Sequence, residues 1–228
     1  MPPRARVNAA TRRRPKSTTR PLVLHPDRRF PAEPTARRIA RALHASVAGL
    51  PIVSPHGHTD PAWFALNAPF GNAADLLLRP DHYLLRMLYS QGIALAALGI
   101  GGAAADRIAD PRASWRLLAQ NYPPFRGTPS RLWHDWVFAE VFGLTLRLEA
   151  ETADLYYETI TEALAGDGFR PRALFDRFGI ELIATTESPL DSLAHHQAIR
   201  AENASSIVAK PGSSPAAGAP RSCSPNAR

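Results

Sequence analysis

Apolar residues recur every three or four positions along much of the chain, which is the spacing of one face of an α-helix. In segment 34–50, Ile39, Leu43 and Val47 are four residues apart, and Thr35 is a plausible N-cap. Later segments repeat the pattern, and several begin at Asp-Pro or Thr-Pro or end at glycine, as helices do. The pattern therefore predicts helices over residues 34–50, 80–92, 110–122, 128–143, 149–166, 170–179 and 189–201.

Two short segments, 51–54 and 180–186, lack this spacing and are rich in β-branched and other apolar residues, as buried strands are. Two such strands bury little alone, so they predict part of a larger sheet. A strand, a series of helices and a second strand is how a (β/α)8 barrel begins, and such barrels have about 250 residues. We therefore expect an α/β protein: a (β/α)8 barrel truncated to about its first two strands. A large helical insertion would make it mostly helical, with the two strands as parallel neighbours.

The two ends of the chain differ in composition from the body. Residues 1–20 carry seven basic and no acidic side chains, which accounts for the formal net charge of +7. Residues 203–228 are rich in Ser, Ala and Pro and hold no acidic residue. Neither segment has an apolar face, so we expect a disordered basic tail over 1–20 and a disordered tail over 203–228. Both should pack against nothing, around a folded body at residues 21–202.

Composition narrows the class of protein. The chain has 228 residues and 45% hydrophobic content, which is ordinary for a globular protein. Its longest apolar run, residues 93–105, is too short to span a bilayer, so we expect no membrane partner. The single cysteine, Cys223, excludes an intramolecular disulfide and fits a reducing compartment, so we expect the cytoplasm. The basic tail allows weak nucleic-acid binding, although the body of the chain is electrically balanced.

Candidate chemistry is concentrated in the sequence SPHGHTDP. His56 and His58 follow the first predicted strand at spacing i and i+2, and side chains at this spacing point to the same face of an extended chain. Two convergent imidazoles are a common way to hold a transition metal. The alternative is a turn in which Asp60 caps two loop histidines. His195 and His196 are adjacent on a predicted helix and diverge by about 100°, so we expect them to be structural.

Five stretches of the sequence together resemble the uronate isomerase (glucuronate isomerase) family of the metal-dependent amidohydrolase superfamily. The resemblance runs from about Pro21 to about Ala201. Many hydrolases contain His-x-His, but its combination with DHYLLR and ATTESPLDSLAHH distinguishes the isomerase from its hydrolytic relatives. The stretches are PIVSPHGHTDPAWFA, PDHYLLRMLYSQGI, RGTPSRLWHDWVFAEVFG, ETADLYYETI and IELIATTESPLDSLAHHQAIRA.

The resemblance implies an aldose–ketose isomerase of hexuronate catabolism that interconverts D-glucuronate and D-fructuronate, and likewise D-galacturonate and D-tagaturonate. It implies that His56 and His58 bind a divalent metal, with zinc as the expected ion. It also implies that His82 and Tyr83 contact the hexuronate substrate and that Tyr83 is catalytic. From spacing alone, a tyrosine among the leucines of a helix is more often part of the core. Whether the intact enzyme forms a homo-oligomer stays an open question.

The chain departs from the family pattern after Ala201. The family continues into a third strand with the motif Pro-x-(Trp/Phe)-Arg-Pro-Asp, whereas residues 203–228 here are typical of an out-of-frame end. The late Asp that completes the family's metal site, and a further carboxylate-binding Arg, also find no match. We therefore expect weak or absent metal binding and no isomerase activity from this chain alone. Two alternatives stay open: a metal-dependent hydrolase of the same superfamily, and a non-enzymatic, basic-tailed nucleic-acid-binding protein.

Overall fold

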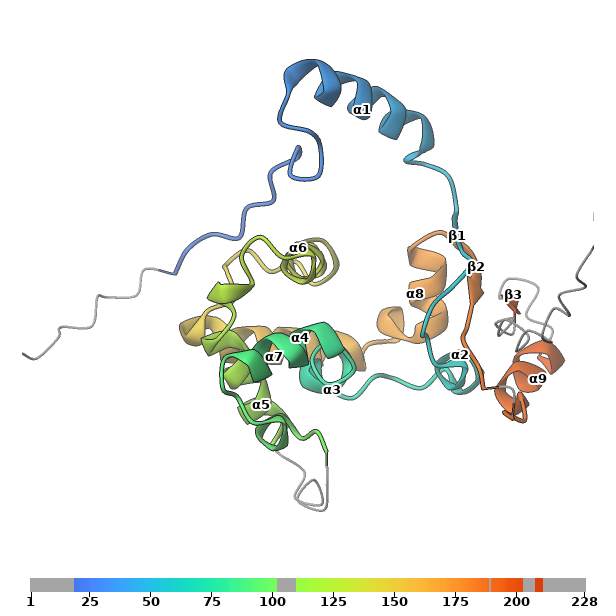
Figure 1. Cartoon of the computed structure of the whole chain (residues 1–228). Coiled ribbons are helices and arrows are strands. Elements are labelled where there is room, and N and C mark those ends of the chain that lie inside the picture. The colour runs from blue at the N-terminus through green and yellow to red at the C-terminus, as the bar shows by residue number, and fades with distance from the viewer. Residues whose placement is uncertain (1–18, 102–109, 189, 203–207, 211–228) are drawn as a thin grey trace, which may run out of the picture.

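The computed structural model describes residues 19–101, 110–188, 190–202 and 208–210. A group of packed helices lies beside a small sheet, and one long helix stands away from both (Figure 1). The α-helices are α1 (Pro34–Val47), α2 (Pro61–Leu66), α3 (Ala73–Leu77), α4 (His82–Ser90), α5 (Pro111–Gln120), α6 (Pro129–Trp136), α7 (Ala153–Ala165), α8 (Pro171–Arg177) and α9 (Ala194–Ala201). The strands are β1 (Ile52–Ser54), β2 (Ile180–Ala184) and β3 (Val208–Lys210). Short 3₁₀ turns cover Leu95–Leu98, Pro123–Phe125, Ala150–Thr152 and Asp167–Phe169, and a π-helical turn covers Val137–Val141.

Local side-chain signals explain where helices begin. Helix α5 begins at Pro111 after its Asp110 cap, as predicted, because proline lacks the N–H that a first helical residue leaves unpaired. Helix α9 begins at Ala194, later than the predicted start at 189. The backbone N–H of Ser188 donates to the Asp191 carboxylate at 2.7 Å. This bond closes a turn between Ser188 and Asp191, and the helix begins only after that turn.

Within the described residues the sheet has three parallel strands in the order β1–β2–β3. Ser54 lies opposite Ile183, with an irregularity in the register between Ile52 and Val53. The prediction that the first two strands are parallel neighbours is confirmed. Because parallel neighbours need a long crossover, the segment holding α2 to α8 serves as that connection. The sheet is small, and most of the described chain is helical.

The predicted tails extend into the folded body. Strand β3, at residues 208–210, pairs with β2. The guanidinium of Arg20 lies 2.5 Å from the carboxylate of Glu149. The expectation that residues 1–20 and 203–228 pack against nothing is therefore wrong at these positions. An isolated segment can join a fold through backbone hydrogen bonds or one ion pair without an apolar face of its own. The remainder of both tails lies outside the described residues, and there the predicted domain boundaries stay predictions.

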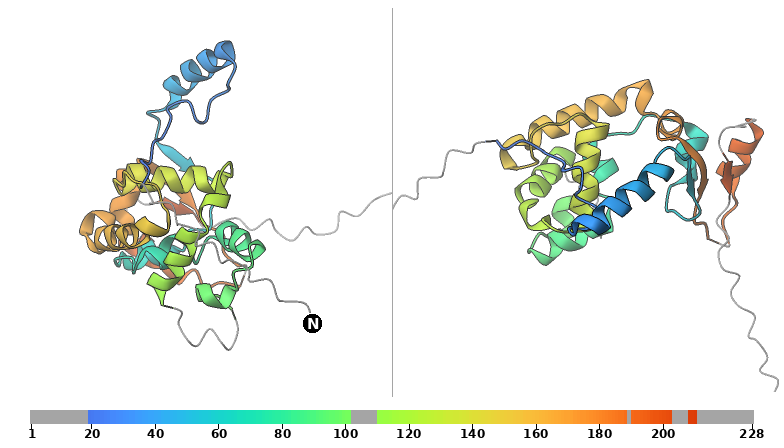
Figure 2. Two further views of the ribbon diagram at one scale, coloured as in Figure 1. Left: turned by 90° about the vertical axis from the view of Figure 1, so that its left-hand side faces the viewer. Right: turned by 90° about the horizontal axis from the view of Figure 1, so that it is seen from above.

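The main core lies between α3, α4, α5 and α7, which pack together in the views of Figures 1 and 2. Phe138 is fully buried at its centre. Its ring centroid lies 5.0 Å from that of Tyr156 and 6.2 Å from that of Trp115, and both rings meet it edge-on. Edge-to-face pairs are favourable because the positive ring edge meets the negative ring face. This core holds these helices together.

A second, smaller core joins the sheet to α2, α8 and α9. Phe64, Phe175, Ile183 and Ile199 are buried together, and the two phenyl centroids lie 6.0 Å apart. Because Phe64 takes the inward position on α2, the adjacent Trp63 is on the exposed side of that helix. Three tryptophans are exposed: Trp63, Trp133 and Trp136.

Helix α1 has no buried residue and stands away from the other elements (Figures 1 and 2). One side is attached to the preceding turn, where the Arg41 guanidinium lies 2.5 Å from Asp27 and the ring of Phe30 meets that of His44 edge-on. The helix predicted from apolar spacing is present, but it ends at Val47, and its N-cap is Glu33 rather than Thr35, because the Glu33 carboxylate accepts from the first free backbone N–H groups. No helix among the described residues combines the length and the apolar character needed to cross a bilayer.

Candidate functional site

The paired histidines lie in the turn between β1 and α2. Their ring centroids are 5.1 Å apart, and the ring planes are nearly perpendicular, at 89°. Both side chains are exposed. The turn follows the carboxyl end of a parallel strand, which is where α/β proteins commonly place functional side chains. The structure thus brings His56 and His58 together, as their spacing predicted.

Residues after β2 support this turn. The Thr186 hydroxyl donates to the carbonyl of Gly57 at 2.9 Å, and its oxygen lies 3.5 Å from Nδ1 of His56. At 3.5 Å the second contact is long for a hydrogen bond, and a His56 tautomer with its proton on Nδ1 would let the ring donate to the Thr186 oxygen. Nε2 is then left with a free lone pair, the form that binds a metal. Spacing along the chain gave no sign of this contact, which depends on β1 and β2 being parallel neighbours.

The two imidazoles of the histidine turn have a spacing that suits a divalent metal ion, but they are only two ligands. Two imidazoles bound through nitrogen at about 2.0–2.1 Å to one tetrahedral ion have ring centroids about 5 Å apart, which the observed separation matches. Asp60 follows in sequence, but its carboxylate caps α2 by accepting from the N–H of Ala62 at 2.8 Å. Among the described residues, no cluster of three His, Cys, Asp or Glu side chains could hold a metal. The described chain therefore offers two ligands where three or four are usual.

A second polar group lies at the same edge of the sheet. Thr185 and His196 share a buried hydrogen bond of 2.8 Å between Oγ1 and Nε2, and a carboxylate oxygen of Glu187 lies 3.8 Å from the same nitrogen. The neighbouring imidazole, His195, is exposed. The two adjacent histidines therefore differ in burial, although both line one small cavity. This cavity measures about 220 Å³, and its lining includes Asp60, Glu187 and His196.

His82 and Tyr83 form the first turn of α4, where the carboxylate of Asp81 caps the helix. Their ring centroids lie 4.1 Å apart with planes tilted by 35°. Tyr83 is 54% exposed, whereas Leu84 and Leu88 occupy the buried face of α4. Tyr83 is therefore not a core residue of α4. Helix α4 lies in the helical group, and its label stands apart from that of β1 in Figure 1.

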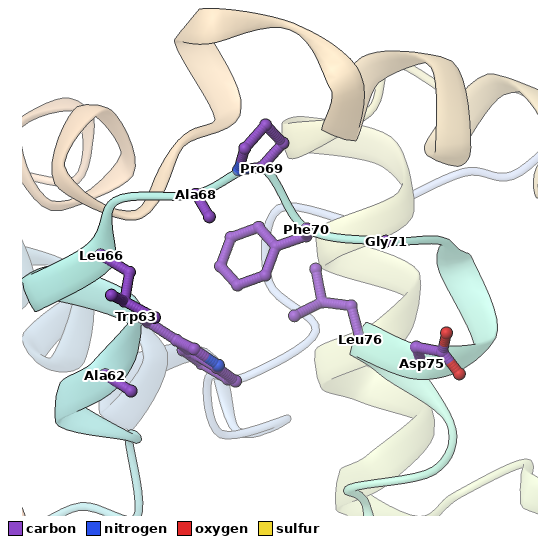
Figure 3. A pocket seen from close by; sticks show the side chains of 9 residues that line it. All are labelled: Ala62, Trp63, Leu66, Ala68, Pro69, Phe70, Gly71, Asp75 and Leu76. Carbon is purple, nitrogen blue, oxygen red and sulfur yellow. The ribbon is translucent and has the colours of Figure 1, made fainter.

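A pocket of about 270 Å³ lies between α2 and α3, apart from all these candidates. Figure 3 shows its mostly apolar lining, in which the Trp63 and Phe70 rings lie beside one another. The two centroids are 5.2 Å apart and the planes nearly perpendicular. Asp75 is the single acidic residue that lines it. None of the four predicted site residues reaches this pocket.

Parallel strands with polar side chains at one edge, joined by a helical crossover, place the chain in the α/β class. Comparison with known proteins identifies the family. The family model described as glucuronate isomerase matches residues 34–219, so the chain belongs to the glucuronate isomerase family. Uronate isomerase from Sphingopyxis alaskensis is 73% identical over 186 residues, and that from Rhizorhabdus wittichii is 67% identical over 184 residues. These relatives favour neither the hydrolase alternative nor the nucleic-acid alternative.

Solved structures agree with this family. The crystal structure of glucuronate isomerase from Caulobacter crescentus matches with a TM-score of 0.76 at 60% identity, over 80% of this chain and 38% of that one. The uronate isomerase from Thermotoga maritima matches with a TM-score of 0.67 at 26% identity, over 76% of this chain and 36% of that one. The match to the Sphingopyxis relative covers 82% of this chain and 39% of the relative. The chain thus spans less than two fifths of the length of these relatives.

Proposed function

We propose that this chain is part of a uronate isomerase that interconverts D-glucuronate and D-fructuronate, and D-galacturonate and D-tagaturonate. The observation that carries the proposal is the 73% identity to a uronate isomerase across a region that includes the histidine turn. The substrate would be a hexuronate, and the expected compartment is the cytoplasm. In this account β1, β2 and β3 are strands of a (β/α)8 barrel, and the segment from α2 to α8 is an enlarged crossover.

His56 and His58 would hold the divalent metal, with zinc as the expected ion. Their separation and exposure suit one shared ion, and Thr186 favours the tautomer of His56 that leaves Nε2 free. When bound, a divalent cation supplies Lewis-acid stabilisation of negative charge on substrate oxygens. With two protein ligands in the described chain, metal affinity should be weak.

His82 and Tyr83 would contact the sugar. An aldose–ketose shift moves a proton between C2 and C1, so it needs a group that takes up and returns protons beside the substrate. The exposed phenol of Tyr83 is the proposed proton-transfer group, and the adjacent His82 imidazole would hydrogen-bond sugar hydroxyls. The part of the relatives outside the matched region would supply the remaining groups of the site.

The chain alone should therefore have no measurable isomerase activity. Removing one electrostatic donor from an active site typically costs about 10²–10³ in rate. Here the resemblance leaves an acidic metal ligand and carboxylate-binding arginines unmatched, so several such losses combine. Incubation of the purified chain with excess zinc or manganese should give no glucuronate turnover above that of a His56→Ala, His58→Ala double variant.

The test of function is a covalent fusion of residues 21–219, which include β3 and the whole family match, to the part of the Sphingopyxis uronate isomerase outside the matched region. The fusion should convert glucuronate to fructuronate. Tyr83→Phe should lower the rate at least about 10²-fold, the range for loss of a general acid–base group. Tyr89→Phe, at another exposed tyrosine of α4, is the matched control and should leave the rate unchanged.

The metal assignment has its own variants in the same fusion. The His56→Ala, His58→Ala double variant should lose turnover, while His44→Ala on α1 should keep it. A well-folded fusion that binds zinc but turns over neither uronate would refute the proposed function. Equal turnover in the double variant would refute the metal site.

A further inference from the structure

The buried imidazole of His196 has no role in the reaction proposed above, although it contacts the strand end beside the histidine turn. On α9, His196 and Ile199 lie three positions apart on the inward face, and they are 9% and 4% exposed. Ile199 packs against Phe64 of α2, and α9 lies beside α2 in Figure 1. His196 instead bonds Thr185, which directly follows β2. Helix α9 therefore contacts both the helix that follows the turn and the strand end next to it.

Two successive threonines connect this imidazole to the turn. Oγ1 of Thr185 lies 2.8 Å from Nε2 of His196, and the bond is buried. The next residue, Thr186, is exposed, and its hydroxyl donates to the carbonyl of Gly57 at 2.9 Å. Gly57 lies between the two predicted metal ligands. Two adjacent residues at the end of β2 therefore make one hydrogen bond to α9 and one to the histidine turn.

The histidine turn rests on the ends of both strands. Ser54, the last residue of β1, donates from its hydroxyl to the carbonyl of His56 at 3.3 Å. A side-chain carbon placed on Gly57 would lie 3.6 Å from the carbonyl oxygen of Ala184, the last residue of β2, so the turn lies in contact with that strand. Two successive carbonyls of the turn thus accept from hydroxyls at the strand ends. A shift of the end of β2 would therefore move the turn as well.

Packing alone does not require a hydrogen bond between α9 and β2. Two buried polar side chains that bond each other can often be replaced together by apolar side chains of the same shape at little cost in stability. A satisfied buried hydrogen bond does, however, select one arrangement of its partners. The bond between Thr185 and His196 therefore fixes the orientation of the strand end, whatever it adds to the stability of the chain.

We propose that His196 is a positioning residue for the metal site: it holds the histidine turn in place through Thr185 and Thr186. The turn then keeps His56 and His58 at the separation that suits one shared divalent ion. Partners that lie outside the set of metal ligands commonly orient those ligands in this way. This inference rests on the proposed function, because it takes the histidine turn as the metal site, but that function assigns no role to His196.

The zinc affinity of the full 228-residue chain, measured by competition titration, tests the proposal. His196→Leu should weaken zinc binding about three- to tenfold, at or below the range of about 10–100-fold for a partner that touches a ligand directly. His196→Gln can place its amide where Nε2 lies and should restore the affinity. His196→Asn reaches only the position of Nδ1 and should behave like the leucine variant. The matched control is His195→Leu, at the exposed neighbouring position on α9, which should leave the affinity unchanged.

The same titration shows whether His196 acts through Thr185. In a Thr185→Val background, His196→Leu should have no further effect on zinc affinity, because the hydrogen bond is already lost. Urea unfolding of each variant shows that the titrated chain is folded, and His196→Asn replaces the leucine variant if that one fails to fold. Unchanged zinc affinity in the folded variants would overturn the proposal. So would independent effects of the two substitutions, since His196 would then act by another route.

Backbone dynamics of the metal-free chain provide a readout that does not depend on zinc. By ¹⁵N relaxation, the order parameters of Gly57 and Thr59 should fall in His196→Leu from about 0.85, typical of rigid backbone, toward about 0.6. Leu118, buried in the main core, should keep its order parameter. Unchanged values at Gly57 and Thr59 would overturn the proposal even if the chain binds no zinc. Lower values in a chain that binds no zinc at the histidine turn would support the positioning role and refute the proposed metal site.

Discussion

Replacing Thr185 by Val tests how much one buried hydrogen bond stabilises the carboxyl end of β2, next to the histidine turn. Thr185 is 1% exposed, and its hydroxyl shares the 2.8 Å hydrogen bond with the buried imidazole of His196. Valine has nearly the same shape but leaves that imidazole nitrogen without a hydrogen-bond partner, since the nearest Glu187 oxygen lies 3.8 Å away. An unsatisfied buried polar group costs about 1–3 kcal/mol.

Urea unfolding measures this cost. With a slope of about 2 kcal/mol per molar urea, the midpoint should fall by about 0.5–1.5 M. The matched background is His196→Phe, in which the imidazole is gone and Thr185→Val should cost much less. The double-mutant cycle should then give a coupling free energy of about 1–2 kcal/mol. Additive effects of the two substitutions would show that the hydrogen bond does not stabilise this edge.

Three further substitutions have effects that follow from the structure. Phe138→Ala should destabilise the chain by about 3–5 kcal/mol in urea unfolding, because it removes the aromatic centre of the main core. Thr186→Val should weaken zinc binding about tenfold in a competition titration, because it removes the hydroxyl that supports the Gly57 carbonyl and lies beside Nδ1 of His56. The Arg116 guanidinium hydrogen-bonds the Asp154 carboxylate and lowers its pKa in the folded state. Asp154 is therefore protonated at a lower pH in the folded chain than in the unfolded chain. Its stabilising contribution is present above the unfolded pKa and is lost as the pH falls through the folded pKa. Asp154→Asn should therefore flatten the loss of stability below about pH 4, measured by thermal unfolding across pH.

Elements with strong local signals were predictable from the sequence. Helix α5 begins where Asp110 and Pro111 predict, and the spacing of Ile39, Leu43 and Val47 correctly predicts α1. The parallel pairing of β1 with β2 followed from the order of elements. Strand β3 was missed because its pairing depends on an available edge of β2, which no local apolar pattern reveals.

The candidate site was predictable only in part. The spacing of His56 and His58 predicted that their rings lie together, since that depends on local backbone geometry. The support from Thr186 depends on two strands that are distant in sequence, so spacing could not indicate it. Trp63 and Phe64 are adjacent aromatic residues of α2, and only Phe64 occupies the inward position. Residue type alone does not decide which of two adjacent aromatic side chains is buried.

The most direct test of the central claim, a metal-binding histidine turn in this chain, is residue-resolved NMR of the imidazole nitrogens. The chain, labelled with ¹⁵N-histidine, would be titrated with zinc. Nε2 of His56 and His58 should shift together, while the resonances of His44 and His134 should stay in place. Zinc-induced shifts at other histidines with the pair unchanged, or shifts that persist after Ala replaces both His56 and His58, would contradict the account.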